Sequence, residues 1–173
     1  MPSPVGHALG GLIVGLVGSR PSRVGSHRAL ALVVAAAVAP DLDFLWFRHN
    51  METHSVGAAV LAGLAVLAWT RARSPGLAAT VTLAWASHVL FDWLGSDTTP
   101  PIGVMALWPF SPHFYFANAF VFDAISRRTG LPNFWSHNLW AVAKEVLMLA
   151  PLAGAVWALR RRHSPDRSTS RFL

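Results

Sequence analysis

"LAWASHVLFDWLGSD", residues 83–97, has the apolar and aromatic composition of a membrane helix, yet it carries an imidazole and a carboxylate. His88 and Asp92 are four residues apart, which places both side chains on one face of a helix. An ionisable group inside a membrane segment is costly and is a functional candidate by default. The stretch therefore predicts a helix that carries a polar site near its carboxyl end.

The composition of the whole chain is typical of a membrane protein. Of its 173 residues, 53% are hydrophobic and 13% are charged, whereas soluble domains have roughly 25% charged residues. The sequence contains no cysteine, which excludes disulfides and thiolate metal sites, so any metal must be held by His, Asp or Glu. No Arg or Lys precedes the first apolar run, which argues against a cleaved signal peptide.

Five apolar stretches, one of which contains His88 and Asp92, predict an all-α, polytopic membrane bundle of about five helices. The stretches are 5–18, 29–47, 54–70, 76–94 and 141–159. The first has glycines at small-xxx-small spacing, which favours close helix packing. We expect one membrane-embedded domain, 1–159, followed by a disordered basic tail, 160–173.

The long connection at 95–140 contains ten of the nineteen aromatic residues. Such a density is typical of a membrane interface, and residues 114–126 are predicted to form an interfacial helix.

The net charge of +6 is explained by topology rather than by nucleic acid, for which no binding is expected. Arginines follow the first, third and fifth apolar stretches, and few lie in the other connections. By the positive-inside rule, the three arginine-rich connections are cytoplasmic. The N-terminus is then outside the cytoplasm and the C-terminus inside it.

The other ionisable residues converge at the opposite, extracytoplasmic end of the apolar stretches. Imidazole nitrogen and carboxylate oxygen suit Zn²⁺, and also Mn²⁺ or Fe²⁺, so this end is a candidate site for one or two ions. The rival interpretation is a hydrogen-bonded His and Asp pair that only stabilises the bundle. The residues at this end are His7, Asp41, Asp43, His49, Glu52, His54, His88, Asp92 and Asp97.

"APDLDF", residues 39–44, places two aspartates two positions apart, where a regular helix would point them in nearly opposite directions. Pro40 is expected to kink or end the helix. Asp41 is then a direct metal ligand and Asp43 orients a histidine through its free N–H, unless an aspartate only caps the helix. His54 is predicted to be a ligand, while Ser55 or Thr53 caps the third stretch.

The order of these motifs, PDLD at 40–43, THS at 53–55, HxxxD at 88–92 and LWPFS at 107–111, resembles the YdjM-like family of membrane-bound metal-dependent hydrolases. The resemblance covers roughly residues 5–125. It implies an inner-membrane protein of bacterial type with a zinc site. The ligands that it implies are His7, Asp41, His54, His88 and Asp92, and we keep His49, Glu52 and Ser55 as additional candidates.

A more distant likeness is to zinc-dependent phospholipase C, whose further HxxxE motif is absent here because Ala141 stands four residues after His137. A full three-metal cluster is therefore not expected. His137 and His113 are better explained as interfacial histidines.

The expected chemistry is metal-assisted hydrolysis, in which the ion activates water and a carboxylate, Asp43 or Asp97, takes the proton. The aromatic connection indicates a lipid-linked or amphipathic substrate, with a phosphoester as the first choice and membrane lipids as partners. The alternatives are a non-catalytic membrane protein that binds metal or haem, and a transporter.

Overall fold

The computed structural model describes residues 1–18, 27–46 and 49–162, in which helices are joined by loops and no strand is formed. Two isolated bridges, Gly95 with Phe122 and Val104 with Tyr115, occur in the long connection. The predicted all-α class is confirmed for the described chain. The elements are α1 (Pro4–Gly18), α2 (His27–Val38), the 3-10 helix η2 (Ala39–Trp46), α3 (Val56–Trp69), α4 (Pro75–Trp93) and α5 (Phe134–Arg162).

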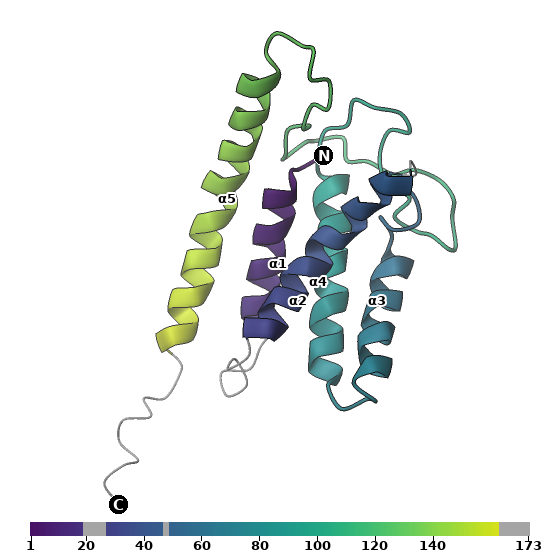
Figure 1. Ribbon diagram of the computed structural model, residues 1–173, viewed down its shortest axis with the longest axis vertical. Coiled ribbons are helices and arrows are strands. Elements are labelled where there is room, and N and C mark those ends of the chain that lie inside the picture. Colours follow the sequence, from purple (N-terminus) through teal and green to yellow (C-terminus); the bar gives the residue numbers. More distant parts are fainter. Residues whose placement is uncertain (19–26, 47–48, 163–173) are drawn as a thin grey trace, which may run out of the picture.

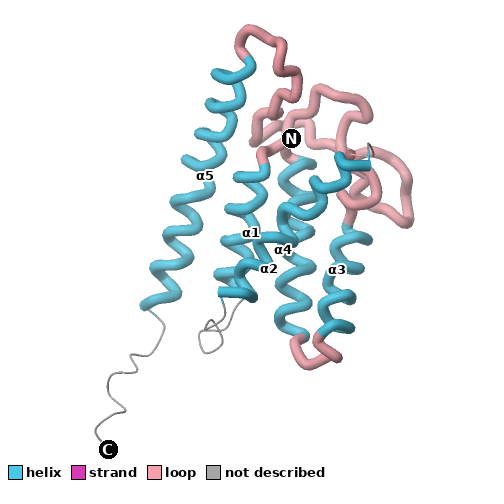
Figure 2. Tube along the Cα trace, viewed as in Figure 1, coloured by secondary structure: helices cyan, strands magenta, loops and turns pink. Residues whose placement is uncertain are grey.

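Helix α4 is the centre of the bundle and packs against α1, α2 and α3. Helix α1 packs in turn against α2 and α5, and Figure 1 shows α5 at the edge of the molecule beside α1. The N-terminus, η2 and the long connection between α4 and α5 lie at one end of the bundle (Figure 2). We call this the loop end; the short α3–α4 turn lies at the opposite, or turn, end.

Glycines on α1 allow its backbone to approach both neighbours closely. A Cβ atom at Gly11 would lie 2.5 Å from the Cβ of Ala37 on α2, and one at Gly10 would lie 2.7 Å from the ring of Phe91 on α4. The predicted use of the small-xxx-small pattern in close helix packing is confirmed. Small side chains also dominate the core between α2, α3 and α4, which consists of Val33, Ala36, Ala37, Val66, Ala78, Val81 and Ala84.

The predicted break at "APDLDF" is confirmed. Helix α2 ends at Val38 and the chain continues as η2, because Pro40 has no amide hydrogen for the α-helical ladder. Helix α3 begins after Ser55, whose side chain accepts a hydrogen bond from the amide of Ala58 at 3.0 Å. The predicted N-cap of this helix is therefore Ser55.

The predicted interfacial helix at 114–126 is wrong, since these residues form irregular loop. Their amides bond to distant segments rather than to the preceding turn. The amide of Tyr115 donates to the Val104 carbonyl at 2.8 Å. The amide of Ala117 donates to the Trp93 carbonyl at 2.9 Å, and the amide of Val121 donates to the Leu94 carbonyl at 2.8 Å. Partners at the end of α4 and elsewhere in the long connection thus replace the bonds a helix would make.

Among the described residues, α5 alone is long and apolar enough to cross a membrane, while α1 and α3 are shorter apolar helices. Crossing by the other segments stays a prediction. Helix α5 begins at Phe134, earlier than the predicted 141, and continues through Arg162 into the predicted tail. Residues 163–173, the remainder of that tail, lie outside the described part of the chain.

Candidate metal centre

The pair in the 83–97 stretch is buried in the last turns of α4. His88 is 0% exposed and Asp92 is 1% exposed, and His88 Nε2 lies 3.0 Å from Asp92 Oδ2. On the other side of the ring, His88 Nδ1 donates a hydrogen bond to the carbonyl of Ala37, at 2.7 Å. The carbonyl can only accept, so this bond leaves the Nε2 lone pair free to bind a metal ion.

His54, in the connection before α3, presents the same nitrogen to the same carboxylate. Its Nε2 lies 3.3 Å from Asp92 Oδ2, while its Nδ1 lies 3.1 Å from Asp43 Oδ2. The segment is anchored by Trp85 of α4, whose Nε1–H donates to the carbonyl of Thr53 at 2.8 Å. His54 therefore points Nε2 toward His88 and Asp92.

Asp41, at the start of η2, provides the fourth group. Its Oδ1 lies 3.7 Å from His54 Nε2 and 3.7 Å from His88 Nε2. Zinc bound tetrahedrally to nitrogen and oxygen at 2.0–2.1 Å separates its ligand atoms by about 3.3 Å. The four separations between a histidine nitrogen and an aspartate oxygen in this set, 3.0 to 3.7 Å, bracket that value.

His7, on the first turns of α1, approaches from the other side of Asp92. Its Nε2 lies 3.3 Å from Asp92 Oδ1, and its ring stacks on that of His88 with centroids 3.7 Å apart. Asp92 thus offers Oδ1 to His7 and Oδ2 to His54 and His88. This arrangement suits either a fifth ligand to one ion or a carboxylate that bridges two.

Several polar atoms in this group are buried with no hydrogen-bond partner among the described residues: Nε2 of His7, His54 and His88, and both carboxylate oxygens of Asp92. A buried polar atom without a partner costs about 1–3 kcal/mol. The five atoms converge, and they are of the types that bind Zn²⁺, Mn²⁺ or Fe²⁺. The residues present therefore fit a divalent ion. We call His7, Asp41, His54, His88 and Asp92 the His/Asp cluster.

Asp43 contacts His54 at Nδ1, the ring nitrogen that faces away from the cluster. Its carboxylate accepts from Thr53 Oγ1 at 2.6 Å and contacts His49 Nδ1 at 2.8 Å and His54 Nδ1 at 3.1 Å. Three side chains that can donate a hydrogen bond, His49, Thr53 and His54, thus face the Asp43 carboxylate. Asp43 is therefore an anion that orients the imidazole of His54.

The other candidates lie around the cluster. Asp97 Oδ1 accepts from the amide of Thr99 at 3.0 Å, and Asp97 Oδ2 accepts from the amide of Gly103 at 3.1 Å. The hydroxyl of Ser55 donates to the Glu52 carbonyl at 2.5 Å besides capping α3. The prediction that Asp97 or Asp43 takes the proton stays untested.

His49 joins the edge of the centre, since it forms a second possible metal group with Asp43 and His54. Its Nε2 accepts a hydrogen bond from Arg127 at 2.7 Å. Both His113 and His137 are exposed, and His137 Nε2 donates to the Ala124 carbonyl at 2.7 Å.

Glu145 was missed by the sequence reasoning. This glutamate lies inside α5 and is 1% exposed. The signal was present, because Glu145 is an acidic residue within an apolar stretch long enough to cross a membrane. Arg127, which bonds to His49, is one of the few arginines outside the arginine-rich connections, and this unusual position was a second signal.

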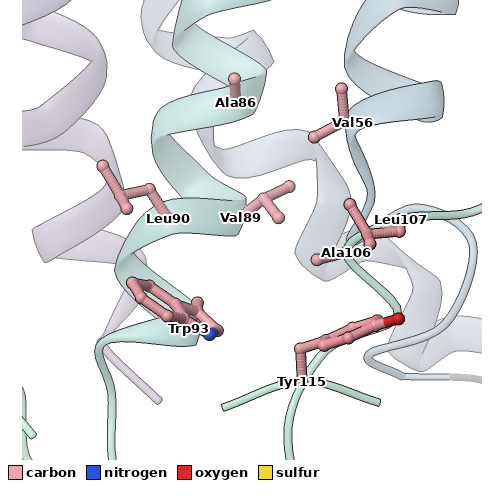
Figure 3. Close-up of a pocket in the computed structure, with 8 residues that line it drawn as sticks. All are labelled: Val56, Ala86, Val89, Leu90, Trp93, Ala106, Leu107 and Tyr115. Atoms are coloured by element: carbon pink, nitrogen blue, oxygen red, sulfur yellow. The ribbon is translucent and has the colours of Figure 1, made fainter. Parts of the chain in front are cut away.

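A separate apolar groove of about 320 Å³ lies between α3, α4 and the long connection (Figure 3). The α4 residues that line it are at positions roughly opposite to His88 on the helix. The groove therefore does not provide access to the cluster. Its lining is Val56, Ala86, Val89, Leu90, Trp93, Ala106, Leu107 and Tyr115.

Fold and site together define an all-helical protein with a buried His/Asp cluster of the kind that binds divalent ions. The family model described as YdjM inner membrane protein matches residues 1–163, so the chain belongs to that family. No curated protein and no solved structure matches the chain. The likeness to zinc-dependent phospholipase C is accordingly not confirmed.

Proposed function

We propose that this protein is a membrane-bound, metal-dependent hydrolase whose ion, most simply Zn²⁺, is held by the His/Asp cluster. The observation that carries the proposal is the convergence of five buried nitrogen and oxygen atoms that have no hydrogen-bond partner among the described residues. Buried polar atoms of a folded protein usually make hydrogen bonds of good geometry, and these five do not, although they lie close together. A divalent ion satisfies all of them at once.

Asp41 marks the side from which a substrate reaches the cluster. It is 19% exposed, whereas His54 and His88 are 0% exposed and Asp92 is 1% exposed. In a 3-10 helix, residues three apart share a face, so Phe44 follows Asp41 along the same row of η2. Phe44 is 54% exposed. A substrate that reaches Asp41 therefore meets an apolar surface, which supports the choice of an amphipathic or lipid-linked ester.

A bound divalent ion would polarise the phosphoryl or acyl oxygen and lower the pKa of water toward about 7. Residues of the chain orient the histidine ligands toward the place of this ion. Asp43 and the Ala37 carbonyl orient the rings of His54 and His88. Asp43 and Asp97 remain the proposed proton acceptors, and the carboxylate of each also accepts hydrogen bonds within the fold.

Haem binding is less well supported by the geometry. Two axial histidines would have to lie on opposite faces of a porphyrin, yet the rings of His7 and His88 stack directly at 3.7 Å. None of the residues that line the apolar groove is a histidine. A Soret band in the purified protein would favour the haem alternative.

We further propose a polytopic arrangement in which the loop end faces the extracytoplasmic side. The arginine distribution supports this orientation. Exposed aromatic side chains at the loop end, Phe110 at 95% and Trp135 at 81%, support a place at the membrane interface. The cluster then lies at interface depth, where an amphipathic substrate is available.

The test is metal-dependent hydrolysis by the purified protein. Metal content is measured by ICP-MS, and hydrolysis is assayed with chromogenic phosphomonoesters, phosphodiesters and carboxyl esters of short and long chain. We expect activity that a chelator abolishes and added Zn²⁺ or Mn²⁺ restores, with long-chain esters preferred. Bound metal with no hydrolysis of any ester would favour the non-catalytic alternative, and a preparation that binds no divalent ion would overturn the proposal.

A further inference from the structure

Helix α5 buries one acidic side chain on the face that packs against α1. The buried residues recur every four positions and form a single stripe of otherwise small or apolar side chains. A glutamate in this stripe has no packing advantage over Leu or Ala, and its desolvation is costly. The stripe consists of Ala141, Glu145, Leu149 and Ala153.

Both carboxylate oxygens of Glu145 bind Ser3, the residue that precedes α1. Oε1 accepts from the amide of Ser3 at 2.8 Å, and Oε2 accepts from the hydroxyl of Ser3. The oxygen of that hydroxyl accepts in turn from the amide of Gly6 at 3.2 Å. The contact is close, since a Cβ atom at Gly6 would lie 2.7 Å from Glu145 Oε2.

This pattern is a capping box completed by another helix. In the usual motif, the N-cap serine accepts from the amide three residues on, and a glutamate at that third position accepts from the amide of the N-cap. Here Gly6 occupies the third position, and Glu145 of α5 supplies the carboxylate. A carboxylate at this place also interacts favourably with the amino end of the helix dipole.

The next residue after the box is the cluster residue His7, whose amide donates to the Ser3 carbonyl at 3.2 Å. His7 has no hydrogen bond to either ring nitrogen among the described residues, so no second partner orients its imidazole as Asp43 orients His54. Apart from its stacking on His88, the place of the His7 ring is set by the backbone at the start of α1. We propose that Glu145 is a positioning residue of the metal centre, which acts from α5 through Ser3 on His7.

The inference rests on the metal centre of the proposed function, but its first test does not. Hydrogen exchange of the 1–12 segment is measured by mass spectrometry in the metal-free protein. Glu145→Ala should speed exchange at the first amides of α1 by roughly 5-fold, the factor expected from a lost cap. Leu149→Ala is the matched control because Leu149 is 5% exposed in the same stripe, one turn away. It should leave those amides less affected.

The second test measures Zn²⁺ affinity by competition with a chelator in a double-mutant cycle with His7→Ala. Glu145→Ala should weaken binding roughly 5-fold in the native background and should have no further effect when His7 is already alanine. Glu145→Gln should recover part of the affinity, because its amide oxygen can still accept from Ser3 N–H. Leu149→Ala should leave the affinity unchanged even where it lowers the melting temperature.

The outcomes separate the inference from the function on which it rests. Unchanged exchange in Glu145→Ala would overturn the capping role. Equal losses of affinity in Glu145→Ala and Leu149→Ala, or fully additive effects with His7→Ala, would overturn the positioning role. A native protein without affinity for any divalent ion would overturn the proposed function and with it the positioning role, while the exchange result still decides whether Glu145 caps α1.

Discussion

The two ends of the helical bundle differ in the burial of their ionisable side chains. At the loop end, imidazoles and carboxylates are buried against one another in the His/Asp cluster. At the turn end, Arg71 and Arg73 in the α3–α4 turn are exposed, as are Arg161 and Arg162 at the end of α5 (Figure 1). The cluster residues are buried in contact with one another, whereas the exposed arginines are open to water or lipid headgroups. Under the proposed function, the buried residues of the loop end would carry the chemistry and the exposed arginines of the turn end would set the topology.

The largest expected difference between the ends is their compartment. The native chain has no cysteine, so a single introduced cysteine is the only one that can react. A Cβ atom added at Gly130 or Gly76 would meet nothing within 4 Å, so Gly130→Cys and Gly76→Cys form a matched pair. With a membrane-impermeant maleimide, Gly130→Cys at the loop end should react in intact cells. Gly76→Cys, next to the α3–α4 turn, should react only after lysis. The reverse pattern would place the cluster on the cytoplasmic side and favour a soluble substrate.

The second prediction removes the α4 pair from the loop end. His88→Ala combined with Asp92→Ala should reduce bound metal to background by ICP-MS, because it removes a nitrogen and both oxygens of the central carboxylate. The fold should persist in circular dichroism, since the core between α2, α3 and α4 is apolar and does not include these residues. His113→Ala is the control, because His113 is an exposed histidine of the long connection. Unchanged metal content in the double variant would exclude the pair as ligands.

The third prediction separates two carboxylates within η2. Asp41→Asn should cause most of the metal affinity to be lost, because a ligating anion is replaced by a neutral amide. Asp43→Asn should weaken binding by roughly 10- to 100-fold, the usual effect of losing a group that orients a histidine ligand. Chelator competition measures both. Equal and severe losses would mean that Asp43 also coordinates the ion.

Part of the cluster could be predicted because some of its residues are close together in the sequence. His88 and Asp92 are four residues apart, which places them on one face of any α-helix. The break in the helix before Asp41 follows from the missing amide hydrogen of Pro40. The order of the apolar stretches also predicted that His7, His54, His88 and Asp92 lie at the same end of the bundle. The structure brings them together in that way.

The features that could not be predicted depend on contacts between distant segments. Glu145 is 142 residues from Ser3, and its role is visible only once α5 packs against α1. Likewise, the loop at 114–126 has aromatic residues suited to an interfacial helix, but its amides bond to the end of α4, to Val104 and to Met1 instead. Local composition does not report such partners, because the free energy of the tertiary contacts decides between a helix and a loop.

The smallest expected effect concerns Ser55, which the sequence left as either a ligand or a cap. Its hydroxyl accepts from Ala58 and donates to the Glu52 carbonyl, which accounts for its burial without a metal. Ser55→Ala should lower the free energy of unfolding by about 1 kcal/mol, whereas Ser55→Gly should cost only a few tenths, because glycine tolerates the N-cap position. Thermal melts of the metal-free protein measure both changes, and metal content should remain that of the native chain. A ligand role would instead remove metal equally in the two variants, since neither has an oxygen to offer.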